Sequence, residues 1–289
     1  MYEKPKGKPR EGGRTSRTPR PSSPRRPTTG SPSKQSRATG VQPNAPADRS
    51  PSPQIPQDVT VDELDRSLVN ELRTLPEGLA ETVGRHLAAA QRSLDEDDLD
   101  LAAAHVAAAR RRAGRVPAVR ETAGVIAYLQ GRYADALTEL RTARRMTGSV
   151  ELVPMIADCE RALGRPQQAL DLVRSIDTAE VDADIRVELL LVAAGARSDM
   201  GNADAAVVTL QVPDLKNLPA GAARARLQLG YAEFLRAAGR LEEARSWMER
   251  AAASDVEGVT MAGERFDEIS GYRFVEEADI KTPADPASD

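Results

Sequence analysis

Few residues in this sequence could do catalytic or metal chemistry. The only histidines are His86 and His105, and the only cysteine is Cys159. An acidic run from Asp95 to Asp98 lies between the two histidines, so these groups could in principle be combined into a metal site. Their spacing matches no known ligand pattern, whereas two histidines on consecutive helices usually pack between helices or lie on the surface. We therefore expect no metal.

Motifs for enzyme activity are also missing. The sequence has no G-x-G-x-x-G or G-x-x-x-x-G-K-[ST] phosphate loop, no H-E-x-x-H, no G-x-S-x-G and no C-x-x-C. The acidic run is explained by its place at a helix start, where carboxylates complement the positive end of the helix dipole. We expect no enzyme activity, no catalytic residues and no cofactor.

Arginines form a second cluster, and it has two interpretations. Cations near helix C-termini complement the dipole, which is a sufficient structural explanation. Stacked repeats with their helix ends in line would also bring these arginines into one basic patch for RNA or an acidic partner. The patch would comprise Arg110, Arg111, Arg112 and Arg115, with Arg120, Arg141, Arg144 and Arg145 from the following repeat.

Charge is divided unevenly along the chain. Residues 1–56 carry twelve Lys and Arg against three acidic residues, a net charge of +9, and residues 57–289 carry 28 against 41, or −13. Residues 1–56 are rich in Pro, Ser and Arg, so we expect a disordered tail. It could be a solubilising tail that lies on its own acidic body, a nucleic-acid arm, or a docking and modification segment. The Ser-Pro and Thr-Pro sites of that segment would be Thr18, Ser23, Ser31, Ser50 and Ser52.

The compartment follows from cysteine content and hydropathy. One cysteine excludes an intramolecular disulfide framework, and no apolar run of signal-peptide length follows the basic start. The longest apolar run, Leu189–Ala196, is much shorter than the ~20 residues that span a bilayer. We expect a cytoplasmic protein without a membrane partner.

The best-defined pattern is a repeated pair of helices. A turn of the form x-Gly-Arg or x-Gly-Asn is followed five residues after its Gly by an Ala, at successive spacings of 34, 33, 37 and 38 residues. These register alanines are Ala102, Ala136, Ala169, Ala206 and Ala244, and the first follows an acidic variant of the turn at Asp97. Small residues recur twelve positions earlier, and apolar residues four positions later, as close helix crossing requires. The small residues are Ala90, Gly124, Ala157, Ala194 and Ala232, and the apolar ones are Val106, Leu140, Val173, Leu210 and Met248.

With these features the chain resembles tetratricopeptide-repeat (TPR) proteins. It is most similar to an actinobacterial group in which a disordered basic arm precedes about five repeats. The similar runs are VRETAG at 119–124, RTARRMTG at 141–148, IADCERALGRP at 156–166, VAAGARSDMG at 192–201 and AAVVTLQVP at 205–213. The resemblance covers about residues 57–255, and it implies an all-α helical-hairpin solenoid wound as a right-handed superhelix. It implies a fold and no particular activity.

The predicted domains are the tail (1–56), a TPR-like α-solenoid of about five repeats with capping helices (57–275), and a disordered C-terminal tail (276–289). Thr60 and Glu63 form a capping box that opens an N-terminal cap helix over residues 60–75. A second helix follows from Pro76. Two prolines and an Asn predict an irregular linker over 211–219, before helices at 219–238 and 240–253. Residues 261–275 are interpreted as a short capping helix or a frayed end.

The groove lined by the first helix of each repeat is the third candidate surface. Glu121 and Pro154 occupy the positions of the carboxylate clamp found in chaperone-binding members, so a terminal Glu-Glu-Val-Asp peptide is not expected. The groove has mixed charge and few aromatics, which disfavours a small-molecule substrate. The repeat register places ten residues in it: Gln91, Glu121, Val125, Tyr128, Asp158, Arg161, Glu188, Arg226, Glu233 and Arg236.

These observations favour a non-enzymatic scaffold that binds another protein in its groove. The alternative is an RNA- or ribosome-associated accessory protein that uses the basic arm and the arginine patch.

Overall fold

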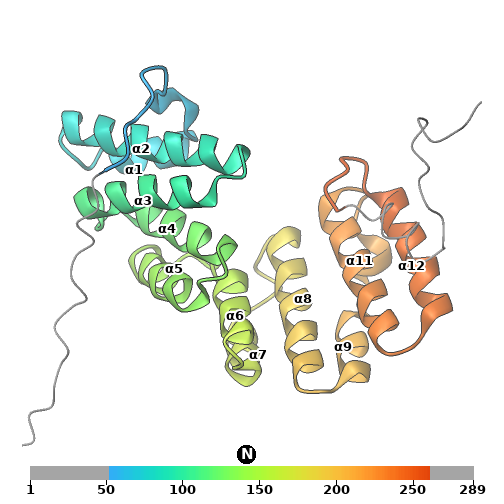
Figure 1. Cartoon of the computed structure of the whole chain (residues 1–289). Helices are drawn as coiled ribbons and strands as arrows, with labels where there is room; N and C mark the ends of the chain where they lie inside the picture. Colours follow the sequence, from blue (N-terminus) through green and yellow to red (C-terminus); the bar gives the residue numbers. More distant parts are fainter. Residues whose placement is uncertain (1–51, 261–289) are drawn as a thin grey trace, which may run out of the picture. The chain divides into compact units, whose positions relative to one another are not determined.

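The computed structural model describes residues 52–260, and within that range the chain forms helices and no strand (Figure 1). The predicted tail up to residue 51 and the predicted segments after residue 260 lie outside the described residues. In chain order the helices are a short 3-10 helix η1 (Val61–Glu63), α1 (Arg66–Leu72), α2 (Glu77–Asp95), α3 (Leu99–Ala113), α4 (Pro117–Leu129), α5 (Tyr133–Thr147), α6 (Val153–Ala162), α7 (Pro166–Arg174), α8 (Ala183–Asp199), α9 (Ala203–Leu210), α10 (Asp214–Asn217), α11 (Ala222–Ala237) and α12 (Leu241–Ser254).

Helical hairpins repeat along the chain. The pairs α2/α3, α4/α5, α6/α7, α8/α9 and α11/α12 pack together, and each pair contacts the next (Figure 1). The turn glycines of the last four hairpins, Gly131, Gly164, Gly201 and Gly239, have φ between +70° and +78°. Glycine adopts this left-handed conformation without steric cost. At the first turn Asp97 adopts φ +59°, the only positive φ of a non-glycine residue in the described range.

Burial confirms the predicted repeat register. All five register alanines are fully buried, and the four alanines that stand twelve positions before them are fully buried too. The fifth small residue, Gly124, lies where α4 crosses α5, and a Cβ there would stand only 2.5 Å from Leu140 Cγ. Small residues are therefore required by close helix crossing, which is a packing role.

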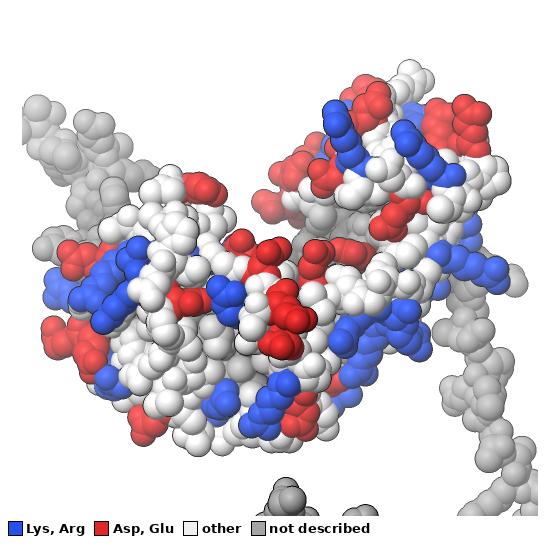
Figure 2. Space-filling view, turned by 180° about the vertical axis from the view of Figure 1, so that it is seen from behind, with Lys and Arg blue, Asp and Glu red and all other residues white. Residues whose placement is uncertain are grey.

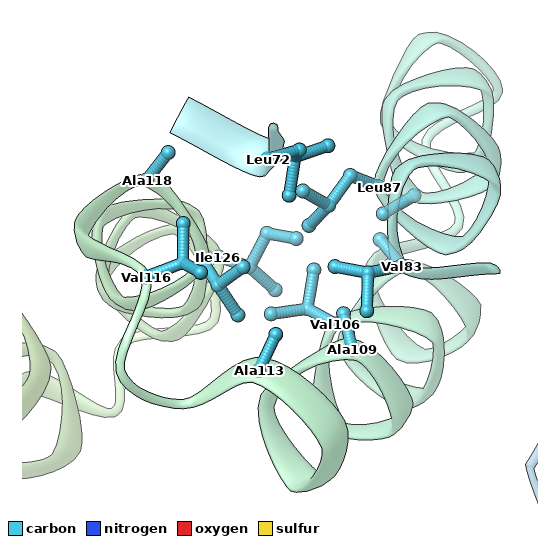
Figure 3. Packing of buried hydrophobic residues seen from close by; sticks show 12 residues of the cluster. Leu72, Val83, Leu87, Val106, Ala109, Ala113, Val116, Ala118 and Ile126 are labelled. Carbon is cyan, nitrogen blue, oxygen red and sulfur yellow. The ribbon is translucent and has the colours of Figure 1, made fainter. Parts of the chain in front are cut away.

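The N-terminal cap differs from the expected continuous helix over residues 60–75. Glu63 accepts the Thr60 backbone N–H at 2.7 Å, as the capping box predicts. The turn ends there because Leu64 is extended (φ −84°, ψ 151°), and α1 starts afresh after Asp65. Figure 3 shows Leu72 of α1 directed at Leu87 of α2, in the cluster that α1 to α4 share. The segment covers the first hairpin even though it is broken.

The predicted linker over 211–219 also contains structure. Residues Asp214–Asn217 form the single turn α10, with Leu215 buried against α11. The Gln228 side-chain amide donates to the Leu215 carbonyl at 2.8 Å, and Ser254 donates to the Gln228 amide oxygen at 2.9 Å. The irregular connection is thereby held to both helices of the last hairpin.

Candidate functional site

A groove opens along the first helices of successive hairpins. It contains a cavity of about 490 Å³ with a half-buried apolar floor and charged sides. Figure 2 shows one face of the molecule on which acidic side chains gather around a hollow of the surface. The lining comes from α4, the segment before α6, α6 itself, α8 and α11: Tyr128, Glu151, Pro154, Met155, Asp158, Arg161, Ile185, Glu188, Leu191, Val192 and Phe234.

A chain of polar contacts fixes one side of this groove. The Tyr128 hydroxyl donates to Asp158 Oδ2 at 2.6 Å, and Arg161 Nη1 donates to Asp158 Oδ1 at 2.5 Å. Arg161 Nε also donates to Asp199 Oδ2 at 2.8 Å, so its guanidinium joins α6 to the end of α8. Burial and the bond to Asp158 raise the pKa of the Tyr128 phenol, which therefore stays protonated. These groups are oriented before any ligand arrives.

The electrostatic balance of the groove is acidic. Among the described lining residues the one cation, Arg161, is neutralised by two aspartates. Glu188 is paired with Arg226 at the edge, and Glu151 adds a further negative charge at the rim. Partial burial raises the pKa of Glu188, whereas the nearby Arg226 opposes that rise. Arg226 Nε lies 3.1 Å from Glu188 Oε1, an ion pair without the alignment of a hydrogen bond.

Four of the ten predicted groove residues line the cavity together: Tyr128, Asp158, Arg161 and Glu188. Two others, Arg226 and Glu121, lie close to its edge. Arg226 contacts Glu188. Burial raises the pKa of the Glu121 carboxyl, and repulsion from Glu151 adds to that rise. The other four predicted positions are not part of the lining, and two of them form an ion pair with each other on α11. These four are Gln91, Val125, Glu233 and Arg236.

Sequence reasoning missed several apolar lining residues. Leu191 stands fifteen positions before its register alanine, as Glu121 and Pro154 of the clamp positions do, so the register itself contained the signal. Phe234 of α11 closes the cavity from the far side, next to the predicted Glu233. No local pattern distinguishes it, because its role depends on where α11 crosses α8 after the linker.

Three arginines of the predicted patch, Arg110, Arg120 and Arg141, are engaged in ion pairs within the fold. Arg110 and Arg120 both bind the buried carboxylate of Glu139, the latter at 2.7 Å. Arg141 binds Glu160, whose side chain is 2 % exposed, and Arg165 Nη1 lies 3.2 Å from the same carboxylate. These arginines neutralise buried carboxylates between neighbouring hairpins. Arg144 and Arg145 line a shallow surface hollow with Arg141, and Arg115 is exposed.

The histidines and the cysteine, which could in principle catalyse a reaction or bind a metal, are buried between packed helices. His86 of α2 and His105 of α3 are each 2 % exposed, and their Nδ1 atoms lie 3.1 Å apart. Cys159 is fully buried, and burial raises the pKa of its thiol to about 11. Within residues 52–260 no three His, Cys, Asp or Glu side chains are grouped as metal ligands would be. No helix in that range combines the length and apolar character of a membrane span.

Comparison with protein-family models finds no match for this sequence, and comparison with curated proteins also finds none. Among solved structures it is similar to TTC0263, a thermophilic TPR protein of Thermus thermophilus. The TM-score is 0.52 and the identity 16 %, over 65 % of this chain and 98 % of that one. A TPR protein from Parabacteroides merdae gives a TM-score of 0.44 at 16 % identity, over 66 % and 74 % of the two chains. A Rap protein complexed with Competence and Sporulation Factor gives 0.49 at 14 % identity, over 68 % and 60 %. The likeness to TTC0263 confirms the predicted TPR-like all-α fold.

Proposed function

We propose that this protein is a non-enzymatic scaffold that binds an extended segment of another protein in the groove between α4 and α11. The observation that carries the proposal is the cavity in which Tyr128, Asp158 and Arg161 are already oriented beside an apolar floor. Ligand sites combine apolar walls with a few placed polar groups in this manner.

The geometry favours an extended occupant over a compact ligand. Helices in contact lie about 8–10 Å apart, and an extended residue spans about 3.3 Å, so about three residues would cross each helix. The cavity lining includes four successive first helices, α4, α6, α8 and α11. A segment of roughly eight to ten residues would therefore cross all four helices, with part of it inside the cavity.

The charges indicate the chemistry of that segment. Glu151 and Glu188 line the cavity, and Glu188 is paired with Arg226 at its edge. Arg161 is held by Asp158 and Asp199. We propose an occupant with one or two Lys or Arg residues for the rim and an apolar side chain for the floor near Met155 and Phe234. Phosphate groups would be repelled here, which favours a protein ligand over RNA at this surface.

The test is selection of random displayed peptides on the full-length chain, followed by calorimetry with a selected peptide. We expect peptides enriched in Lys and Arg beside an apolar residue. The double variant Glu151→Gln/Glu188→Gln should weaken binding about tenfold, because two partly exposed ion pairs contribute about 1–2 kcal/mol together.

Arg144→Gln/Arg145→Gln on α5 is the control, since it also removes two charges, one exposed and one partly buried, but outside the cavity, and it should leave the affinity unaltered. Equal affinity of the wild type and the glutamate variant would refute the groove assignment.

A further inference from the structure

A serine hydroxyl lies between two arginines at the edge of the first hairpin. Arg111 Nη2 and Arg112 Nη1, on the last turn of α3, donate to Ser52 Oγ at 3.1 and 3.2 Å. Ser52 is followed directly by Pro53, so it is one of the Ser-Pro sites of the chain. Two cationic donors thus converge on one neutral acceptor.

The position of Ser52 is set by the chain that follows it. Ile55 packs against Val59 and against Ala88 and Ala89 of α2. Arg85 Nε donates to the Val59 carbonyl at 2.9 Å, and its Nη2 donates to the Pro56 carbonyl at 3.0 Å. These contacts anchor residues 55–59 on α2, and the chain before them then leads Ser52 to the end of α3.

The anchor stops short of the serine itself. No backbone–backbone hydrogen bond joins residues 52–54 to another described residue, so this short piece can separate from α3 without breaking one. A Ser-Pro dipeptide is extended by nature, because the proline ring restricts the residue before it to β or polyproline conformations. Ser52 can therefore be presented to an enzyme as an extended segment and afterwards return to the arginines.

We propose that Ser52 is a phosphorylation site and that Arg111 and Arg112 are the receptor for its phosphate. The donor is a nucleoside triphosphate, and the catalyst is a separate proline-directed Ser/Thr protein kinase. The Ser52 Oγ–P bond forms and the bond from the γ-phosphorus to the β,γ-bridging oxygen breaks. The hydroxyl proton passes to a base of the kinase, and the nucleoside diphosphate leaves.

The modification suits the two guanidinium groups better than the hydroxyl does. A serine oxygen offers two lone pairs and no charge, whereas a phosphate ester carries about −1.5 to −2 charges and three acceptor oxygens. Arginine binds phosphate with charge-assisted, often bidentate hydrogen bonds. Phosphorylation would fasten the chain at residue 52 to α3, so it would fix where the basic arm leaves the folded repeats. This inference does not depend on what the groove binds.

The first experiment treats the full-length chain with a recombinant proline-directed kinase and ATP, followed by site mapping with mass spectrometry. We expect phosphate on Ser52, and we expect Pro53→Ala to abolish it while modification at Ser23 and Ser31 continues. Modification of those other sites with none at Ser52 would overturn the assignment of the site.

The second experiment tests the receptor with full-length protein that carries phosphoserine at position 52, by ³¹P NMR against pH. The second pKa of a free phosphoserine is about 6, and we expect the two cations to lower it by about one unit. Arg111→Gln/Arg112→Gln should return it to about 6. Both substitutions are of exposed side chains, and far-UV circular dichroism checks that the fold persists. The same phosphate pKa in both proteins would overturn the assignment of Arg111 and Arg112 as the receptor.

Discussion

Lowering the pH from 7.5 to 5.5 should reduce the free energy of unfolding through the buried histidine pair. Burial lowers the pKa of His86 to about 4, with further contributions from His105 and from Arg112, Arg111 and Arg85, and burial also lowers the pKa of His105. In the unfolded chain a histidine titrates near 6.5. Below that pH the unfolded state takes up protons that the folded state excludes, so stability falls until the folded pKa is reached.

The expected loss in the free energy of unfolding is large for a single residue. His86 alone should account for about 1.4 kcal/mol at pH 5.5 and about 3 kcal/mol at pH 4. Urea unfolding at both pH values measures it, with His86→Gln/His105→Gln as the comparison because an amide keeps a polar group without titrating. We expect the double variant to lose most of the pH dependence between 7.5 and 5.5. An unchanged slope in that variant would show that other groups are responsible.

The second large effect concerns peptide binding in the groove, and it rests on Gly195. The Arg161 guanidinium lies against this glycine of α8, and a Cβ there would stand 2.4 Å from Arg161 Cζ. Gly195→Ala should push the guanidinium off Asp199 and into the cavity, where it occupies space and repels a basic ligand. We expect about a tenfold loss of affinity for a groove-selected peptide, equivalent to about 1.4 kcal/mol.

Gly78→Ala provides the matched control for that variant. It makes the same substitution in a helix, but its Cβ would meet no atom within 4 Å. Gly78 lies in the first turn of α2, outside the cavity lining, so a difference in peptide affinity between the two variants reports on Arg161. Isothermal calorimetry at one ionic strength measures it. Equal affinities for the two variants would mean that the position of Arg161 does not govern binding.

The repeat architecture was predictable because its signal is packing, and packing recurs at a fixed spacing. At the repeat position of Ala136, a fully buried alanine lies where the two helices of each hairpin cross. At the position of Gly131, a glycine with positive φ ends the first helix of the hairpin. The break at Leu64 and the turn α10 were not predictable in the same way, because both depend on contacts with distant helices. The local sequence around each segment does not predict those contacts.

The site was predictable only in part for a related physical reason. The register placed Tyr128, Asp158 and Arg161 on one face of adjacent first helices, and the three residues line one cavity. The register did not predict that Glu139 and Glu160 are buried and form ion pairs with Arg110 and Arg141. The contact between Ser52 and Arg112 joins residues 60 positions apart, and only the fold reveals it.

The most direct test of the groove assignment is to map where a natural partner contacts the chain. A photo-crosslinking amino acid would replace Met155 inside the cavity, and in a second protein Val208, which is 64 % exposed on α9. Both full-length proteins would be irradiated in the cells that express the chain, and adducts would be mapped by mass spectrometry. The groove account predicts an adduct from position 155 alone, on a segment of net positive charge with an apolar residue. The same adduct from position 208, or adducts from position 208 only, would contradict it.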